Sequence, residues 1–459
     1  MLIASHRPIF AAVQPDFAAL RHQEFSRLDA AAHAYLDFTG SALYPESLVS
    51  THAEMLRASI LGNPHAESPA SLASTALIAE ARAHVLRFLD ADPATYDVVF
   101  TANASTAIAH VAAGFRFGPD APFVLSADDH NSVNGIREYA RRADAPVHYL
   151  PLDDELRLDA PEVRLAELAR SHGAGGLFAF PAQSNFSGVR HPLSLVQLAQ
   201  SRGYRVLLDA AAFVPTSCLS LRTVPADFVA LSFYKMFGYP TGVGALIARH
   251  DALAELRRPW FAGGTVEFVS VQHEIHALRP GADGFEDGTA DFLAIGAVPL
   301  GLSFLEVVGI TNVEQHATRL AGRLIGMLSA LRHRGGQPLV RIYGPVGAAD
   351  RGATVTFNVL RPDGRAVPYL AVEQRARDAR VSVRCGCFCN PGASERAFGF
   401  PAEETARCLA ATSKSGWSIP KFAECMDGYA VGAIRASLGI PSNCEDLERL
   451  VEVVQSFEA

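Results

Sequence analysis

The stretch Asp227-Phe228-Val229-Ala230-Leu231-Ser232-Phe233-Tyr234-Lys235 places one lysine directly after an apolar run that is typical of a buried strand. Phe233, Tyr234, Phe237 and Tyr239 give Lys235 aromatic neighbours on both sides. An exposed lysine is the commoner case, but aromatic neighbours favour a partly desolvated one. Desolvation lowers the pKa of an amine, and a strand end fixes its direction. We therefore interpret Lys235 as a Schiff-base residue.

Six further short runs of apolar and β-branched residues are typical of strands, and helical patterns separate them. Strands that alternate with helices predict a mainly parallel sheet with helices on both faces. Together with 228–232, the sheet is expected to have seven strands and to form a large α/β domain. The six runs are 97–102, 123–126, 147–150, 177–180, 205–209 and 244–248.

The sequence pattern changes after Gly309. Apolar residues recur at helical spacing over 313–331 and predict a long amphipathic helix that opens a second, α+β domain. A closing helix is expected to begin with a capping box between Ser442 and Glu445. The strand-like runs of this part are 339–343, 353–359, 381–383 and 433–438. The predicted organisation is an N-terminal arm over 1–34, a large domain over 35–309 and a small C-terminal domain over 310–459.

The composition excludes several classes of partner. With 459 residues, 49% hydrophobic and 19% charged, the chain is long enough for two folded domains. A net charge of −8 gives no basic surface for nucleic acid. No apolar stretch reaches the roughly 18 residues of a membrane span. Seven cysteines, an odd number with three in one pentapeptide, argue against a disulfide framework and for a cytoplasmic location.

Polar residues directly after the predicted strands are candidate site residues, because ligands of parallel sheets bind at the carboxyl ends of the strands. Ser105 and Thr106 begin a helical run that could hold a phosphate, although they also suit a helix cap. His130 could stack on a cofactor ring and move protons, or cap a helix. Asp209 could keep a pyridine nitrogen protonated. With Lys235, these residues predict pyridoxal phosphate (PLP) as cofactor.

The second motif is Arg384-Cys385-Gly386-Cys387-Phe388-Cys389-Asn390-Pro391-Gly392. A metal site would want a fourth ligand and more usual two-residue spacings, so no metal is predicted. A redox pair or a structural set of thiols stays open. The favoured interpretation is a nucleophilic cysteine on a mobile loop bounded by Gly and Pro, attacking sulfur rather than carbon. Arg384 and Arg435 could each bind a substrate carboxylate.

Over nearly its whole length the chain resembles the class V aminotransferase family of PLP enzymes (fold type I). Within that family it is most similar to the cysteine desulfurases and to the PLP domain of molybdenum cofactor sulfurases. The motifs that carry the resemblance are 232–242, 181–188, 386–393 and Asn63-Pro64-His65. The resemblance implies a PLP fold of type I, with a large and a small domain, and an amino-acid substrate.

The resemblance also implies roles for single residues. Lys235 would form the Schiff base with the cofactor, Asp209 would pair with the pyridine nitrogen, and His130 would stack on the ring. Asn185 would contact the ring hydroxyl, and Cys389 would become the persulfide. Phosphate contacts are implied for Ser105, Thr106, Ser232 and Tyr234. Family members are dimers with phosphate contacts across the interface, so a homodimer is implied, with Thr289 in the crossing segment.

Three features depart from many cysteine desulfurases. Ala212 replaces a glutamine after the pyridine-binding Asp, and Tyr234 replaces a histidine before the Schiff-base lysine. Both changes fit the sulfurase branch. Eukaryotic molybdenum cofactor sulfurases continue into a further domain, whereas this sequence ends at Ala459. The sulfur acceptor, a protein or a cofactor, is therefore left open.

Our working hypothesis from the sequence is a cysteine desulfurase. It would release alanine from L-cysteine and leave the sulfur on Cys389 for transfer to an acceptor, with Cys387 as a relay or resolving thiol. One alternative is another PLP reaction: a C–S lyase, a selenocysteine lyase or an epimerase, none of which necessarily needs Cys389. A second is a non-catalytic scaffold or a sulfur-carrier-binding protein that kept the fold.

Overall fold

The computed structural model describes residues 15–172, 175–347, 350–414, 416–426 and 429–459. The expected arm over Met1–Gln14 lies outside these residues. After it come two short helices, α1 (Phe17–Glu24) and α2 (Arg27–Ala30). Asp16 caps α1, because its carboxylate accepts hydrogen bonds from the main-chain N–H groups of Ala18 and Ala19.

The large sheet has seven strands, in the order β2-β8-β7-β6-β5-β3-β4. Only β8 runs antiparallel to its neighbours, so the mainly parallel sheet predicted from the sequence is confirmed. Every residue of β3, β5 and β7 is buried, as expected for strands covered on both faces. The strands are β2 (Tyr96–Thr101), β3 (Phe123–Ser126), β4 (Val147–Leu150), β5 (Leu177–Pro181), β6 (Arg205–Asp209), β7 (Phe228–Ser232) and β8 (Gly244–Arg249).

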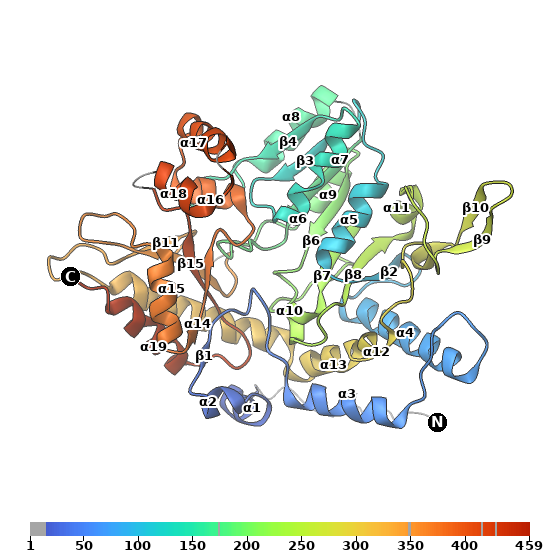
Figure 1. The fold of residues 1–459 in the computed structure, drawn as a ribbon, viewed down its shortest axis with the longest axis horizontal. Helices are drawn as coiled ribbons and strands as arrows, with labels where there is room; N and C mark the ends of the chain where they lie inside the picture. The colour runs from blue at the N-terminus through green and yellow to red at the C-terminus, as the bar shows by residue number, and fades with distance from the viewer. Residues whose placement is uncertain (1–14, 173–174, 348–349, 415, 427–428) are drawn as a thin grey trace.

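Helices cover both faces of this sheet and create two separate apolar cores (Figure 1). One core includes Phe178 and Phe180, and the other includes Leu125 and Leu207. Alternate residues of a strand point to opposite faces, so that one strand contributes side chains to both cores. The helices of this part are α3 (Glu46–Ala58), α4 (Pro69–Phe88), α5 (Ala104–Gly114), α6 (Asn131–Asn134), α7 (Arg137–Arg142), α8 (Pro161–His172), α9 (Leu195–Gln200), α10 (Phe233–Phe237), α11 (His250–Glu255), α12 (Phe292–Ile295), α13 (Val298–Val308) and the 3-10 turn η1 (Gly281–Gly284).

A second, antiparallel sheet of four strands carries the third core, in the order β11-β12-β15-β14. The predicted long helix is α14 (Ile310–Ala330), which packs on β11 and β12. The N-terminal strand β1 (Ala34–Tyr35) pairs with β13, and Ala34 and Leu36 belong to this third core. The other elements are β11 (Val340–Tyr343), β12 (Thr354–Val359), β13 (Val381–Ser382), β14 (Arg384–Gly386), β15 (Ala433–Ser437), α15 (Tyr369–Asp378), α16 (Pro391–Phe398), α17 (Ala402–Lys414), α18 (Ile419–Cys425) and α19 (Cys444–Gln455).

Two local expectations were wrong. The capping box of α19 lies one residue later than predicted, between Asn443 and Asp446, because the Ser442 hydroxyl instead accepts from the N–H of Gly439. The cysteine count suggested no disulfide, yet Cys408 and Cys425 are bonded and join α17 to α18. Sequence spacing could not reveal this pair, because the contact depends on how the two helices fold back on each other.

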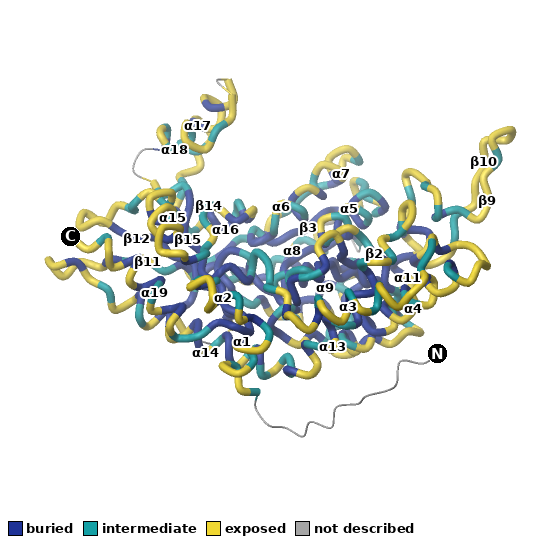
Figure 2. The backbone as a smooth tube through the Cα atoms, turned by 60° about the horizontal axis from the view of Figure 1, so that its bottom comes forward, coloured by how far each residue is buried: buried dark blue, intermediate teal, exposed yellow. Residues whose placement is uncertain are grey.

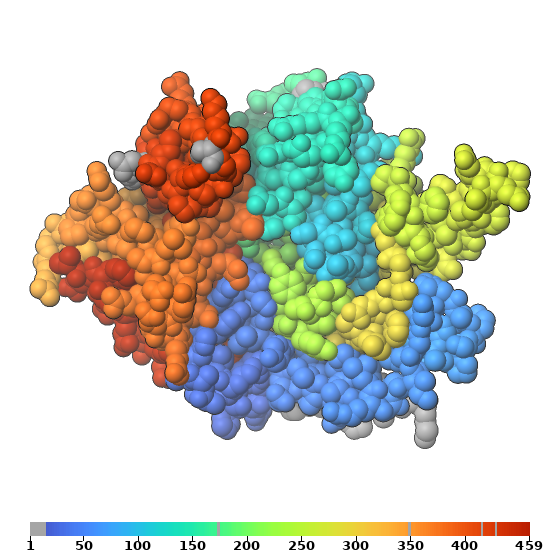
Figure 3. Space-filling view, viewed as in Figure 1, coloured from blue at the N-terminus to red at the C-terminus, as the bar shows by residue number. Residues whose placement is uncertain are grey.

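Two segments project from the body of the molecule. The hairpin of β9 (Val266–Ser270) and β10 (Ile275–Leu278) extends from the large sheet, and the pair α17–α18 stands above the second sheet (Figures 1 and 2). The C-terminal part, in orange and red, lies against the green and teal residues of the large sheet (Figure 3). No single described helix could span a membrane; only Phe292–Val308 with Ile310–Ala330, bent by 69°, meets that criterion as a pair.

Candidate active site

A cleft of about 570 Å³ lies between the carboxyl edge of the large sheet and the second sheet. Strand β14 and the turn that follows it form one wall, and α10 and the segment before α6 contribute to the other. The cleft brings together seven of the predicted site residues: His130, Asn185, Tyr234, Lys235, Arg384, Cys389 and Arg435. These residues come from five segments that are far apart in the sequence.

Lys235 is the third residue of α10, which begins immediately after strand β7. Burial lowers the pKa of the Lys235 amine below its ordinary value; the nearby Asp209 carboxylate opposes this shift, and Arg435 adds to it. Gly238 ends α10 in the left-handed region, at φ 78°. A Cβ at Gly238 would lie 2.3 Å from the main-chain nitrogen of Tyr44, so only glycine fits there. This turn fixes where Lys235 points.

Asp209 and His130 flank the position of Lys235. Asp209 ends strand β6, is buried, and accepts a hydrogen bond of 3.0 Å from the N–H of Ala211. His130 is the N-cap of α6, and its Nδ1 accepts from the N–H of Ser132 at 3.1 Å. The capping and cofactor interpretations of His130 are therefore compatible, because a capping ring also lines the cleft. Burial lowers the pKa of His130 and favours its neutral form.

Three of the residues predicted to hold a phosphate, Ser105, Thr106 and Ser232, gather at the N-terminus of α5, whereas Tyr234 lines the cleft. Asn103 caps this helix, because its Oδ1 accepts from the N–H of Thr106 at 3.1 Å. Ser232, at the end of β7, accepts from the N–H of Ala104 at 2.8 Å. Ser105 shares a hydrogen bond of 2.6 Å with Ser132, the residue that also contacts His130. Hydroxyl groups thus surround a helix N-terminus, where an anion is stabilised.

Among the predicted residues that do not line the cleft itself (Ser105, Thr106, Asp209, Ser232 and Thr289), Thr289 lies in a segment of its own. Its hydroxyl accepts from the Asn63 side chain at 3.3 Å, and it lies in the segment between η1 and α12. Asn63 belongs to the N-terminal motif that carried the family resemblance. The predicted contact of Thr289 with a phosphate across a dimer interface stays a prediction.

Asp37 contacts both arginines that the sequence assigned to a substrate carboxylate. The guanidinium of Arg384 donates to Asp37 with two nitrogens, the closer at 2.6 Å, and Nη2 of Arg435 lies 3.3 Å from Oδ1. Arg435 is buried and also donates to the main-chain oxygen of Asn185 at 2.7 Å. Sequence reasoning missed Asp37, although a carboxylate that ends an apolar run is the same signal that revealed Asp209.

Hydrogen bonds and apolar packing contact the turn that carries Cys389, and its mobility, expected from its glycines and proline, stays a prediction. The N–H of Asn131 donates to the main-chain oxygen of Cys389 at 2.7 Å, and the Asn185 side chain donates to that of Phe388 at 2.5 Å. The Phe388 ring is buried and lies 5.4 Å from the ring of Phe186. Glycine and proline mark a turn, but tertiary contacts decide whether the turn moves.

The three cysteines of the motif differ in environment. Cys385 belongs to β14, and burial raises the pKa of its thiol to about 12, so it stays protonated. Cys387 and Cys389 are exposed at the cleft. Within the described part of the chain, no group of three or more His, Cys, Asp or Glu side chains is arranged to hold a metal ion.

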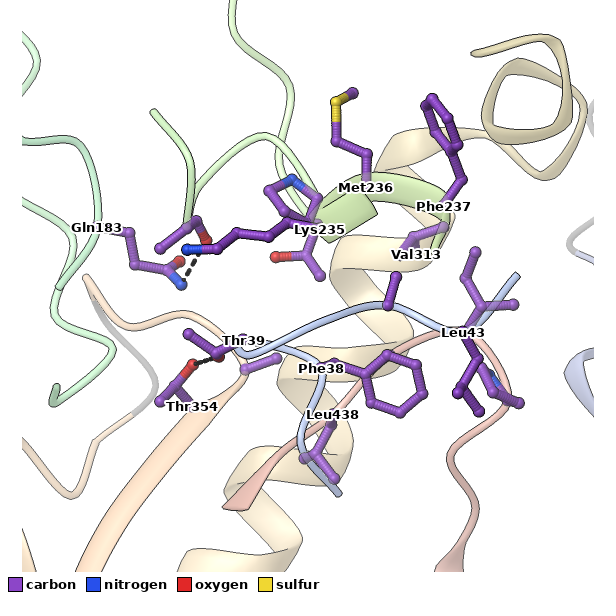
Figure 4. Close-up of a pocket in the computed structure, with 18 of the residues that line it drawn as sticks. Phe38, Thr39, Leu43, Gln183, Lys235, Met236, Phe237, Val313, Thr354 and Leu438 are labelled. Carbon is purple, nitrogen blue, oxygen red and sulfur yellow. Dashed lines mark hydrogen bonds between the residues drawn. The ribbon is translucent and has the colours of Figure 1, made fainter. Parts of the chain in front are cut away.

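A second, much smaller cavity, of about 30 Å³, also borders Lys235 (Figure 4). Its lining is mostly apolar and includes Phe38, Met236 and Leu438. The buried side chain of Gln183 donates to the main-chain oxygen of Ala212 at 2.9 Å. An amide side chain thus lies beside Ala212, the position where many cysteine desulfurases carry glutamine.

The donor set of the cleft fits PLP. An amine of lowered pKa suits a Schiff base, a buried carboxylate suits the pyridine nitrogen, and a hydroxyl-rich helix N-terminus suits the phosphate. Lys235, Asp209 and the Ser105–Thr106–Ser232 group supply these three functions. The three lie at the ends of β7, β6 and β2, on one edge of the sheet.

Comparisons with known proteins show the family of this chain. The family model described as aminotransferase class-V matches residues 34–450. Molybdenum cofactor sulfurases of Arabidopsis thaliana and Bos taurus are 34% and 35% identical, each over 95% of this chain. The alignments cover 58% and 51% of those proteins, so the chain spans about half the length of the curated relatives it matches.

Solved structures show the same fold. An apo cysteine desulfurase from Thermococcus onnurineus NA1 superposes with a TM-score of 0.78 at 24% identity, covering 97% of this chain and 98% of that one. A cysteine desulfurase from Escherichia coli gives 0.76 at 22% identity, covering 96% and 98%. The predicted α/β architecture of PLP fold type I is therefore confirmed. By the family match and the site geometry, the chain belongs to the aminotransferase class-V family of PLP enzymes.

Proposed function

We propose that this protein is a sulfur-transferring PLP enzyme that takes sulfur from L-cysteine, or a related amino acid, and holds it as a persulfide on Cys389. The observation that carries the proposal is the placement of an exposed thiol, Cys389, in the same cleft as Lys235. The sulfurase and desulfurase names of the relatives support it. An enzyme that only rearranges bonds at the amino-acid carbon atoms does not need such a thiol.

When bound, PLP withdraws electrons from the Cα of an amino acid. The chain supplies the other functions. Lys235, an amine of lowered pKa, can accept the Cα proton and return it. Asp209 is placed to stabilise a positive charge on the pyridine nitrogen, and His130, kept neutral by burial, lies on the same wall as Lys235.

The sulfur step belongs to Cys389. Its thiolate attacks the substrate sulfur, the Cβ–S bond breaks, and Cβ takes up a proton, so that cysteine and one thiol give alanine and one persulfide. Lys235 and Arg435 are close enough to Cys389 for a charge interaction, and the thiolate is the nucleophilic form of a cysteine. In this proposal Arg435 and Arg384, both oriented by Asp37, bind the substrate carboxylate.

The test is product analysis with PLP-loaded protein, L-cysteine and a reductant. We expect the wild type to form alanine and sulfide in equal amounts, and Lys235→Ala and Cys389→Ser each to lower alanine formation at least about 100-fold. Cys218→Ser, which removes an exposed thiol away from the cleft, should keep full activity. Pyruvate as product, or full activity of Cys389→Ser, would instead assign a C–S lyase, a selenocysteine lyase or an epimerase.

The assembly and its location are further parts of the proposal. We propose a homodimer, in which Thr289 of one protomer lies near the phosphate site of its partner, and a cytoplasmic enzyme that passes its sulfur to an acceptor protein or cofactor. The pairing of Asn63 with Thr289 supports the first statement, because it orders the crossing segment. Gel filtration with light scattering tests the dimer.

A further inference from the structure

A buried network of polar side chains links the turn of Cys389 to the segment that carries His130. Its centre is Asp128, whose side chain is fully buried. Oδ1 of Asp128 accepts from the Ser184 hydroxyl and from the Asn390 amide, both at 2.8 Å. Oδ2 lies 2.8 Å from Nε2 of His191. From these contacts we infer that Asp128 and Asn390 are positioning residues, which hold Cys389 at the distance from which its sulfur attacks the substrate.

Asn390 connects this network to Cys389 directly. It is fully buried, follows Cys389 in the chain, and donates from one amide nitrogen to Oδ1 and to the main-chain oxygen of Asp128, the latter at 2.9 Å. Its own N–H donates to the main-chain oxygen of Cys387 at 3.0 Å, which closes the turn. Asn390 therefore ties both ends of the Cys389 turn to the large sheet.

The backbone packing gives a second, independent observation. A Cβ on Gly392 would lie 2.2 Å from the main-chain oxygen of Ala127, so the chain after Cys389 rests directly on the residue before Asp128. Both Phe388 and Cys389 have positive φ values, 56° and 57°. Such backbone conformations are unfavourable for side chains other than glycine and persist only when surrounding contacts enforce them.

The burial of Asp128 makes this anchor specific. A buried carboxylate is costly unless donors satisfy it, and here Ser184, Asn390 and His191 converge on its two oxygens. If one of these donors is lost, the buried Asp128 carboxylate is less well stabilised. Because these hydrogen bonds have few alternative arrangements, the network can hold the Cys389 turn in one position.

The network also adjoins the rest of the site. Asp128 lies two residues before His130, and Ser184 lies directly before Asn185. A shift of the Asp128 carboxylate would therefore displace the Cys389 thiol and also His130 and Asn185. Because a small displacement of a reacting group can lower a rate about 100-fold, we expect the sulfur step to depend on Asp128 and Asn390 far more than the Cα proton step does.

This inference rests on the proposed function, and the experiment separates the two. Two steps are measured in the PLP-loaded protein: exchange of the Cα hydrogen of L-alanine in D2O, which needs Lys235 but no thiol, and alanine formation from L-cysteine, which needs Cys389. For Asn390→Ala we expect exchange within about two-fold of wild type, a kcat for alanine formation at least about 10-fold lower, and an unchanged KM. Asp128→Asn, which keeps the shape of the side chain, should show the same split to a smaller extent.

A matched control and a readout without activity complete the test. Asp446→Asn changes another buried carboxylate, which contacts Arg21 and Asn443 and does not line the cleft; it should change neither step by more than two-fold. Amide hydrogen exchange over 386–393 should accelerate in Asn390→Ala but not in the control.

The outcomes decide between the two ideas. If the wild type forms no alanine from cysteine, the proposed function fails. Amide hydrogen exchange over 386–393 then still tests whether Asn390 holds the Cys389 turn in place. If the wild type is active and both Asn390→Ala and Asp128→Asn keep alanine formation within two-fold, the inference is overturned. Parallel loss of both steps in the two variants would also overturn it, because that result assigns the network a general structural role.

Discussion

At the scale of single residues, charge pairing inside the cleft decides what each side chain can do. Asp37 shows this most clearly, because one carboxylate orders two arginines of different exposure: Arg435 is buried, whereas the Arg384 side chain is 50% exposed. Burial lowers the pKa of Arg435 to about 10, and the Asp37 charge opposes that shift. The pair thus keeps a buried guanidinium charged and oriented.

Replacing Asp37 by Ala should therefore destabilise the protein and weaken substrate binding. Removing one partner of a buried pair leaves an uncompensated charge and costs about 3 kcal/mol or more. We expect the free energy of unfolding, measured by urea denaturation, to fall by that amount, and the KM for L-cysteine to rise. Asp154→Ala breaks only the exposed pair with Arg396 and should cost less than about 1 kcal/mol. Equal costs for the two variants would contradict this account.

His130 should make stability depend on pH. Its pKa is lowered in the folded protein, so the unfolded chain takes up a proton first, near pH 6.5, and the folded chain only at lower pH. The free energy of unfolding should fall as the pH drops through this window and stay constant above it. Urea unfolding at pH 7.5 and pH 5 should show a larger loss for wild type than for His130→Gln. An equal loss in both proteins would show that other groups account for it.

At the scale of elements, short helices and turns at the strand ends carry the chemistry. Helix α10 has only five residues, too few to be stable by itself. Its ends are fixed by tertiary contacts: Phe233 and Phe237 are buried in the core, and Gly238 passes close to the backbone of Tyr44. The main-chain oxygen of Tyr234 also accepts from the N–H of Ala42. The direction of Lys235 therefore depends on a segment nearly 200 residues earlier.

Gly238→Ala tests this dependence. The added Cβ meets backbone atoms and the φ is unfavourable, so we expect a loss of more than about 2 kcal/mol in stability and a lower PLP content, measured by absorbance. Gly242→Ala is the matched control, because Gly242 has a similar φ of 77° but nothing within 4 Å of the new Cβ. It should cost about 1 kcal/mol and keep its PLP. Full PLP binding by Gly238→Ala would mean that α10 does not orient the lysine.

At the scale of the whole molecule, the two sheets enclose the cleft, and the hairpin β9–β10 projects from the body of the molecule. The hairpin β9–β10 exposes large apolar side chains, Phe268, Val271 and Ile275 among them. Exposed apolar clusters of this kind mark interaction surfaces. In the proposed homodimer, a second copy of the chain would cover them.

We therefore expect Phe268→Asp to shift the protein from a dimer to a monomer of 49.1 kDa in light scattering. A charge in a buried apolar interface has no compensating partner, which opposes association. Val163→Asp, on the exposed face of α8, changes a similarly exposed apolar residue and should leave the mass unchanged. A wild type that is already a monomer, or a dimeric Phe268→Asp variant, would remove the hairpin from the proposed interface.

Much of this architecture could be predicted because it depends on local sequence patterns. All seven strands of the large sheet lie within one residue of their predicted bounds, since short apolar runs between helices have few alternatives. Asp209, Lys235 and His130 could be found because each follows such a run. Asp37 follows the very short strand β1 and could have been found by the same rule. Tyr369, which also lines the cleft, carries no signal in the sequence.

The sequence by itself determined the succession of strands and helices along the chain and the positions of Lys235 and the cysteine motif in it, because these follow from the periodicity and chemistry of neighbouring residues. The tertiary structure alone decided which groups meet. It placed Asp37 against two arginines, bonded Cys408 to Cys425, and anchored the Cys389 turn through Asp128 and Asn390, which are 262 residues apart. Contacts at such separations depend on how sheets and helices pack, and periodicity along the chain contains no record of that packing.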